Sequence, residues 1–148
     1  MKISTGFNAT PVIRTIFDAY RAEADAAGIA AGPDCLALRR RISVAATTDE
    51  ARAHAAAASE RFKSFVAQDS RLKQNVPDAP PPAGGFTISD DEYISGTPTE
   101  VAEQIIEQCR AVGAGHFLAV LHWGAPIGEV AAAHELFGGK TIPILRKA

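Results

Sequence analysis

Three groups of side chains in this sequence are of types that bind ligands or take part in catalysis. The first is His122, Trp123 and Gly124, which directly follow an apolar segment. The imidazole of His122 can donate or accept a hydrogen bond, and the ring of Trp123 can form the wall of a pocket. Packing alone also explains a tryptophan, so these residues are interpreted either as a ligand-binding edge or as ordinary packing residues.

The second group consists of hydroxyl side chains near the end of another apolar segment. Ser43, Thr47 and Thr48 stand there, and hydroxyls in such a place can contact a phosphate or a substrate. Thr47 and Glu50 are also spaced as a capping box, which explains Thr47 as a helix cap. His54 follows as a lone histidine, a pattern more typical of a solvated helix residue than of a metal ligand.

The third group is acidic. Asp90, Asp91 and Glu92 form a short run, which we interpret as a solvated face and not as a metal site. The two cysteines, Cys35 and Cys109, have neither metal-ligand spacing nor a close second cysteine. This usage favours reduced thiols in a cytoplasmic protein, with Cys109 an unreactive core residue and no metal bound.

Composition excludes several classes of function. The chain has 148 residues, 47% of them hydrophobic and 22% charged, with a formal net charge of −2, which suits one soluble domain. Nothing in this balance favours nucleic acid or a membrane surface. Arginines 39–41 lie inside an apolar segment, which indicates a structural role. No apolar run reaches the ~20 residues of a membrane helix, and no signal peptide is expected at the start.

Periodicity predicts the elements of the first half. Apolar residues at helical spacing predict a helix from about residue 10 to residue 28, introduced by Pro11. Residues 36–45 alternate with period two, which predicts a strand with one apolar face, although Arg40 falls on that face and does not fit. An alanine-rich helix is predicted from residue 47 to about residue 67.

The second half begins with a predicted loop over residues 68–95, rich in proline and glycine. Neither flank is large enough to stand alone, so residues 1–148 are predicted to form a single domain. Thr97-Pro98-Thr99-Glu100 then predicts a helix start, and Gly113 and Gly115 its end. A strand over residues 116–122 and a last helix, weakened at Gly138-Gly139, complete the chain.

This order predicts part of an α/β fold. Strands that are each followed by a helix imply parallel pairing through right-handed crossovers. Two strands, or three if residues 3–7 form another, are too few for a doubly wound sheet or for a barrel of eight.

The sequence resembles the bacterial-luciferase-like flavin monooxygenases. The resemblance is carried by GTPTEVAE at residues 96–103, AVGAGHF at 111–117, ELF at 135–137 and IPILR at 142–146. It extends to DAYR at 18–21, RRRISVA at 39–45 and DEAR at 49–52, so it covers residues 6–146. The order and spacing of these pieces are more specific than any one of them.

The resemblance implies a partial (β/α)₈ (TIM) barrel, consisting of its last two or three βα units with a long loop insertion. It further implies reduced FMN, or deazaflavin in a sister group, bound at the carboxyl ends of the strands, and oxidation of a small organic substrate by O₂. Trp123, His122 and Gly124 are the implied cofactor-binding residues, while residues 68–95 take the place of a mobile lid. The early strands that surround the flavin are absent, so catalytic residues are not assigned.

Two classes of function follow. The chain is an oxidoreductase that needs a complementary N-terminal half-barrel or its own oligomer, or it is a non-catalytic remnant that self-associates or binds a partner. A small ligand-binding module without flavin has only the Trp123 edge in its favour.

Overall fold

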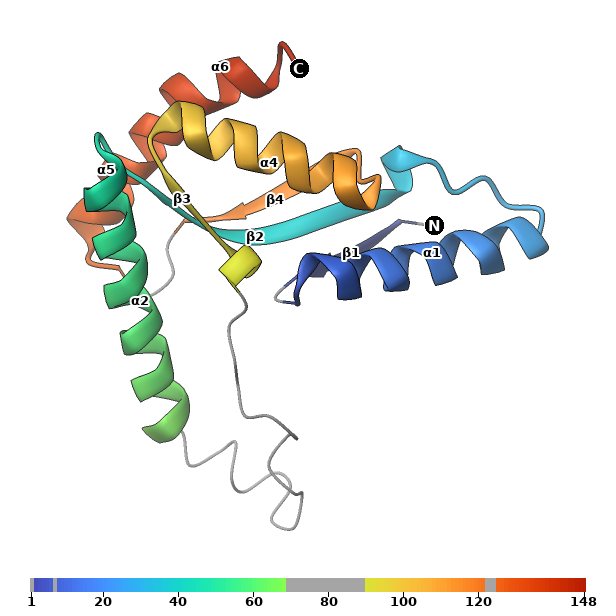
Figure 1. The fold of residues 1–148 in the computed structure, drawn as a ribbon, viewed down its shortest axis with the longest axis horizontal. Helices are drawn as coiled ribbons and strands as arrows, with labels where there is room; N and C mark the ends of the chain where they lie inside the picture. The colour runs from blue at the N-terminus through green and yellow to red at the C-terminus, as the bar shows by residue number, and fades with distance from the viewer. Residues whose placement is uncertain (1, 7, 69–89, 122–124) are drawn as a thin grey trace.

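The computed structural model describes residues 2–6, 8–68, 90–121 and 125–148 (Figure 1). Its strands are β1 (Ile3–Gly6), β2 (Leu36–Val44), β3 (Tyr93–Gly96) and β4 (His116–Val120). Its helices are α1 (Thr10–Ala26), α2 (Thr48–Gln68), α4 (Pro98–Val112), α5 (Ile127–Leu136) and α6 (Ile142–Leu145). The 3₁₀ turns η1 (Pro33–Cys35) and η2 (Asp90–Glu92) precede β2 and β3, and the π-helical turn η3 (Phe137–Thr141) joins α5 to α6.

All strand pairs are parallel, with β2 in the centre. Strand β1 pairs with the first half of β2, from Leu36 to Arg39, and β3 with the second half, from Arg41 to Val44. Strand β4 pairs with Ala37 to Arg41 and therefore overlaps both. Because a strand has only two edges, β1 and β3 share one edge of β2 end to end, and β4 occupies the other.

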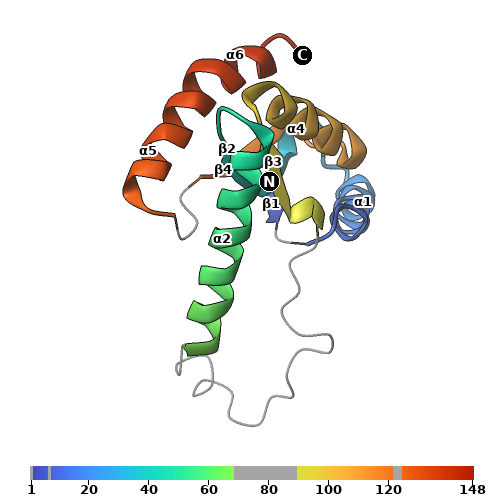
Figure 2. The same ribbon diagram turned by 60° about the vertical axis from the view of Figure 1, so that its left-hand side comes forward.

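The predicted alternation along β2 is confirmed by what covers each face. Leu36 and Leu38 pack with Ile13 and Phe17 of α1 in one buried cluster. Farther along the same face, a second cluster joins β2 to β3, α4, α5 and η3; its buried members are Ile42, Val44, Ile94, Val101, Ile105, Ala133 and Phe137. Figure 2 shows α1, α4, α6 and α5 in an arc around the strands.

The opposite face of β2 is covered in its second half by α2. The hydroxyl of Ser43 donates to the carbonyl of Ala51 in α2 at 2.9 Å, and the Arg41 guanidinium lies 5.3 Å from the centre of the Phe62 ring. Helix α2 thus lies on the side of the sheet away from α1 and α4, and it runs out beyond the strands (Figure 2).

The predicted loop over residues 68–95 is wrong at both ends. Gln68 belongs to α2, while residues 90–95 form η2 and most of β3. Strand β3 has only four residues and one buried apolar side chain, Ile94, so no period marks it in the sequence. The strand conformation of β3 is instead stabilised by its backbone pairing with β2. Residues 69–89, which carry the centre of the predicted lid, lie outside the described residues.

The remaining elements agree with the sequence pattern. The helix predicted to weaken at Gly138-Gly139 passes there into η3, where the α-helical hydrogen bonding is interrupted. Among the described residues, no helix is long and apolar enough to cross a membrane.

Candidate functional site

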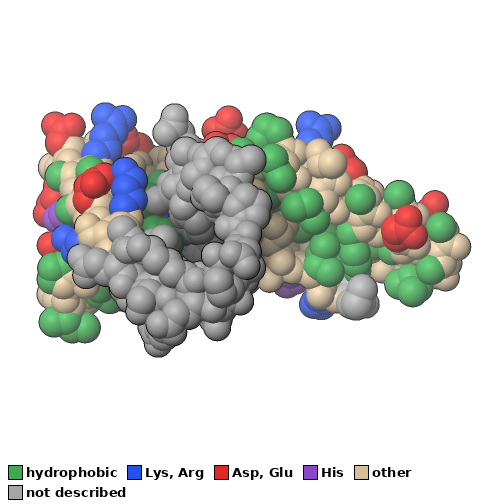
Figure 3. All heavy atoms as spheres, turned by 90° about the horizontal axis from the view of Figure 1, so that it is seen from below, with side chains coloured by type: hydrophobic (Ala, Val, Ile, Leu, Met, Phe, Trp, Pro, Cys, Tyr) green, Lys and Arg blue, Asp and Glu red, His purple; other side chains and the backbone are tan. Residues whose placement is uncertain are grey.

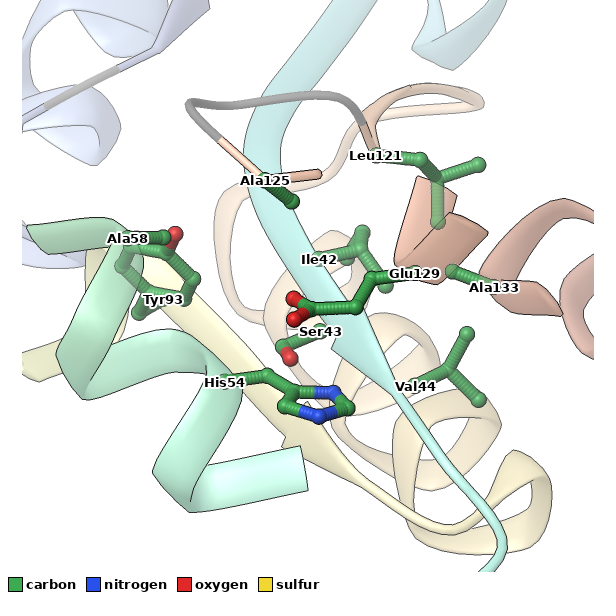
Figure 4. Close-up of a pocket in the computed structure, with 10 residues that line it drawn as sticks. All are labelled: Ile42, Ser43, Val44, His54, Ala58, Tyr93, Leu121, Ala125, Glu129 and Ala133. Carbon is green, nitrogen blue, oxygen red and sulfur yellow. The ribbon is translucent and has the colours of Figure 1, made fainter. Parts of the chain in front are cut away.

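The carboxyl ends of β2 and β4 lie at one edge of the sheet, where α2 and α5 begin. A small cavity of about 20 Å³ opens there, enough for one water molecule (Figure 4). Four polar side chains line it, from four different elements: Ser43 of β2, His54 of α2, Tyr93 of β3 and Glu129 of α5. In Figure 4 the His54 ring, the Ser43 hydroxyl and the Glu129 carboxylate point toward the same space.

Local structure explains how these residues reach one place. Ser43 is the penultimate residue of β2, so α2 starts close by and His54 follows in its second turn. Tyr93 pairs with Arg41 in the parallel register, which puts its side chain on the same face as Ser43. Glu129 lies in the first turn of α5, the helix that follows β4.

A larger hollow adjoins this cavity. It has a volume of about 380 Å³ and lies over the end of β2, between α2 and α5. His54 and Glu129 line both spaces, Glu50 adds a second carboxylate, and the other walls are apolar or glycine backbone: Val44, Ala45, Ala46, Gly128, Ala132 and Leu136. The His54–Glu129 pair therefore marks the polar part of this face.

Some of the polar side chains that line the cavity are already hydrogen-bonded within the protein, and others are not. The Ser43 hydroxyl donates its hydrogen bond to the carbonyl of Ala51. The side chains of His54 and Glu129 make no hydrogen bond to any described residue. Burial raises the pKa of Tyr93, with Arg41 and Arg61 acting in the opposite direction, so its phenol stays protonated at neutral pH. His54, Glu129 and the Tyr93 hydroxyl are thus the groups able to bind a water or a ligand atom.

A second network at this edge joins the N-termini of α2 and α4. The carboxylate of Glu100 accepts from the backbone N–H of Thr97 at 2.8 Å, from the Thr97 hydroxyl at 2.9 Å and from the Thr48 hydroxyl at 2.7 Å. The predicted capping box of α4 is confirmed, and Thr48 extends it to α2. The Thr97 backbone N–H, then the Thr48 and Thr97 hydroxyls, hold the pKa of Glu100 below its ordinary value.

Gly96 makes this network possible. Its φ of +152° lies in the region that favours glycine, and a Cβ placed there would lie 2.7 Å from a carboxylate oxygen of Glu100. The glycine of the GTPTE segment is thus required by its backbone conformation and by the close approach of Glu100.

The predicted site residues have different outcomes. His122, Trp123 and Gly124 lie outside the described residues, and their role stays a prediction; Leu121 and Ala125 on either side of them line the small cavity.

The hydroxyl candidates are accounted for by structural hydrogen bonds. Thr47 accepts from the Glu50 backbone N–H at 3.3 Å, as predicted for a cap. The Thr48 hydroxyl donates to Glu100, and the Ser43 hydroxyl donates to the carbonyl of Ala51. His54 is half-buried on α2 and lines the cavity, and its interpretation as a solvated helix residue stays a prediction. Two further polar residues of the cavity, Glu129 and Tyr93, were not among the residues predicted from the sequence.

A sequence rule could have found Glu129 and His54. Each follows a predicted parallel strand within about two helical turns, and the carboxyl ends of such strands meet at one edge. Tyr93 carried no comparable signal, because β3 itself was not predicted.

The described residues do not fit a flavin mononucleotide by themselves. The two spaces at this edge have volumes of about 20 and 380 Å³, and the larger one is lined by the carboxylates of Glu50 and Glu129. Carboxylates repel a phosphate, and Ser43, Thr47 and Thr48 are engaged elsewhere. A pocket normally buries most of its ligand, so a flavin would need walls from residues other than these.

No protein-family model matches the sequence, and a search of curated proteins finds no match. Solved structures do match. Monooxygenase RslO1 from Streptomyces bottropensis matches with a TM-score of 0.70 and 21% identity, over 99% of this chain and 41% of its own.

Two further matches are described together with flavins. The oxygenating constituent of 3,6-diketocamphane monooxygenase from Pseudomonas putida, in complex with FMN, has a TM-score of 0.69 and 18% identity, over 98% of this chain and 43% of its own. Riboflavin lyase, with modified FMN and riboflavin, has a TM-score of 0.60 and 19% identity, over 98% of this chain and 38% of its own. The chain thus spans about two-fifths of the length of these structures, and at such identities the likeness concerns the fold.

Proposed function

We propose, because the chain has part of the fold of the luciferase-like flavin monooxygenases, that it forms the C-terminal portion of a flavin-dependent oxidoreductase. One observation carries this proposal: almost the entire chain matches about two-fifths of each solved structure, two of which are described with FMN. The reaction would use O₂ and reduced FMN, or a deazaflavin, to oxidise a small organic substrate.

The polar edge supports the location of the ligand site. In barrels of parallel strands, active sites lie at the carboxyl ends of the strands, and the His54–Glu129 pair lies at that end here. We propose that this edge supplies one wall of the flavin and substrate site, with Trp123, His122 and Gly124 between Leu121 and Ala125 as cofactor-binding residues.

The rest of the site would come from elsewhere. The described sheet has four strands, β1, β2, β3 and β4, whereas a closed barrel has eight. We propose a complementary N-terminal half-barrel, or further copies of this chain, as the source of the missing walls.

The test uses FMN itself and the fluorescence of Trp123, the only tryptophan. FMN is titrated into the purified chain alone, then into a fusion that carries the N-terminal barrel portion of monooxygenase RslO1 ahead of it. We expect the chain alone to bind FMN with a Kd weaker than about 1 µM, roughly −8 kcal/mol, and the fusion to bind more tightly with quenching of Trp123.

A matched pair of variants locates the site in the fusion. His54→Gln is expected to weaken FMN binding, whereas His134→Gln is not. Among the described residues, the His134 side chain on α5 hydrogen-bonds only within its own helix, to the carbonyl of Val130 at 2.8 Å. Micromolar binding by the unfused chain would show that it builds its own site, and absence of binding by a folded fusion would argue against the flavin function.

The alternative function is a non-catalytic, self-associating or partner-binding module. It is favoured by apolar side chains left exposed on the described surface, among them Val12, Ile16 and Leu118. A fusion that folds but never binds flavin, together with an isolated chain that forms one defined oligomer, would favour this second function.

A further inference from the structure

The start of α1 has no cap from its own neighbourhood. Ala9 stands at the N-cap position, and no side chain there accepts a hydrogen bond from the first turn. Thr10 is the first residue of α1, so its backbone N–H has no acceptor within the helix, and Pro11 has no N–H at all. That partner comes from far along the chain: Oδ2 of Asp91, in η2, accepts from Thr10 at 2.7 Å across 81 positions of sequence.

This contact belongs to a closed ring of hydrogen bonds among four elements. Arg40 of β2 donates from Nε to Gln108 Oε1 of α4 at 2.7 Å, and from Nη2 to the Thr10 hydroxyl at 3.0 Å. Gln108 in turn donates from Nε2 to the Asp91 backbone carbonyl at 3.1 Å. Asp91 closes the ring by accepting from the Thr10 N–H. Arg40 itself is fully buried, so the ring supplies partners that its guanidinium cannot obtain from water.

The ring lies where β1 and β3 meet. Residues of β2 pair with β1 up to Arg39 and with β3 from Arg41 onward, which leaves Arg40 at the junction. Strand β3 follows η2 directly, so any movement that takes Asp91 away from α1 also pulls on the start of β3.

We propose that Asp91 is a long-range N-terminal cap of α1, which couples the first turn of that helix to the docking of η2 and β3 against β2. When η2 is docked, the Thr10 N–H and the Arg40 guanidinium both have partners. When η2 leaves, the Thr10 N–H loses its acceptor, and Gln108, which holds Arg40, loses the Asp91 carbonyl, so the first turn of α1 frays together with the β3 edge.

The charges around Asp91 suit this role. Arg40 faces it from β2, Glu92 adjoins it in η2, and Glu107 of α4 lines the same hollow of about 270 Å³. The Thr10 backbone hydrogen bond, with the Arg40 charge as a smaller contribution, holds the pKa of Asp91 below its ordinary value. Asp91 is therefore a carboxylate at neutral pH, the form in which it accepts from a helix N-terminus.

Hydrogen–deuterium exchange tests the proposal on the full chain. Asp91→Ala is expected to speed exchange of the amides in the first two turns of α1 (residues 12–17) by about fivefold, the usual effect of losing a helix cap, and to speed exchange in β3 as well. Asp91→Asn, which keeps an acceptor oxygen, is expected to stay close to wild type. Glu103→Ala is the matched control, because it removes an exposed acidic side chain of α4 that makes none of the hydrogen bonds of the ring.

A local cap provides the decisive rescue. Ala9→Ser in the Asp91→Ala background places a hydroxyl at the N-cap of α1, and we expect it to slow exchange in residues 12–17 while exchange in β3 stays fast. Should Asp91→Ala fail to fold, recovery of folding in the Ala9→Ser double variant supports the capping role. Unchanged α1 exchange in folded Asp91→Ala, or failure of Ala9→Ser to slow exchange in residues 12–17 of the double variant, overturns it.

Discussion

Arg40 and Arg41, neighbours in β2, face opposite sides of the sheet. Arg41 pairs directly with η2, through Glu92, whereas Arg40 bonds to Thr10 and Gln108, which themselves hydrogen-bond to Asp91 of η2. Arg40 belongs to the ring described above. Arg41 is 1% exposed and forms an ion pair with Glu92 at 2.9 Å, with the Phe62 ring against its guanidinium. A buried ion pair adds little net stability, but removing one partner leaves a buried charge. These arginines therefore act through specific partners, and we expect the loss of those partners to destabilise the fold around β2.

The first prediction concerns this pair. Glu92→Gln leaves the Arg41 charge buried without its carboxylate, and we expect a loss of about 3 kcal/mol or more in the free energy of unfolding, measured by urea denaturation. Glu60→Gln is the matched control, since Glu60 pairs with Lys63 while both side chains are largely exposed. We expect the control to change stability by less than about 1 kcal/mol. Equal effects of the two substitutions would contradict the assignment.

Glu100 gives a second prediction, on pH. Its pKa is lower in the folded state than in the unfolded chain, so its contribution to stability is fully present above the unfolded pKa and is lost as pH falls through the folded pKa. We expect the free energy of unfolding to decrease below roughly pH 4.5, and Glu100→Gln to flatten part of that decrease. The measurement is urea denaturation between neutral and acidic pH. Glu103→Gln, an exposed change on the same helix, should leave the pH profile as in wild type; a profile unchanged by Glu100→Gln would refute the prediction.

At the scale of elements, the N-termini of α2 and α4 are joined above the end of β2. Glu100 bonds to Thr97 and Thr48 together, so the two helices share one carboxylate as their cap. Gly96 adjoins that carboxylate in a conformation that side chains rarely adopt. The junction between β3 and α4 thus depends on glycine at residue 96 as much as on the capping residues.

The third prediction tests this junction. Gly96→Ala is expected to lower the free energy of unfolding by about 1–3 kcal/mol, because the backbone conformation is strained for alanine and the new Cβ meets Glu100. Gly128→Ala is the matched control in α5, where a Cβ meets nothing within 4 Å. There alanine should be neutral or stabilise by up to about 1 kcal/mol, through its helix propensity. Thermal unfolding of both variants under one set of conditions makes the comparison, and a neutral Gly96→Ala would count against it.

At the scale of the whole molecule, the sheet is open on both sides. In the described part of the chain, β1 and β4 each pair only with β2, which leaves one edge of each strand free. Apolar side chains are exposed nearby: Val12 by 49% and Ile16 by 41% on α1, and Leu118 by 44% on β4. Figure 3 shows hydrophobic side chains gathered on the half of the molecule that carries α1. Open edges and apolar patches of this kind favour association.

The fourth prediction follows from this surface. The isolated chain is expected to self-associate in light-scattering measurements, and Val12→Lys combined with Ile16→Lys is expected to shift the distribution toward 15.6 kDa, the mass of one chain. The control is Ile127→Lys, which removes a side chain 84% exposed at the start of α5. A stable wild-type monomer with sharp cooperative melting would contradict the expectation.

The sequence by itself determined the local elements and their order. The caps of α4, the alternation along β2 and the break at Gly138-Gly139 are interactions or propensities within a few residues of one another, so they are legible without knowledge of the fold. The resemblance to luciferase-like barrels likewise rested on the order of such pieces, and the matches to solved structures bear out a partial luciferase-like fold.

Only the tertiary structure decided what those elements bring together. Strand β3 exists because β2 offers it an edge, and the partners of Arg40 lie at Thr10 and Gln108, on elements far apart in the chain. His54 and Glu129 likewise line one cavity from two separate helices. Their meeting depends on how helices pack against a sheet, which is a long-range property that no local pattern encodes. For the same reason, the alternation along β2 does not explain Arg40 on the apolar face, whereas its hydrogen bonds to Thr10 and Gln108 do.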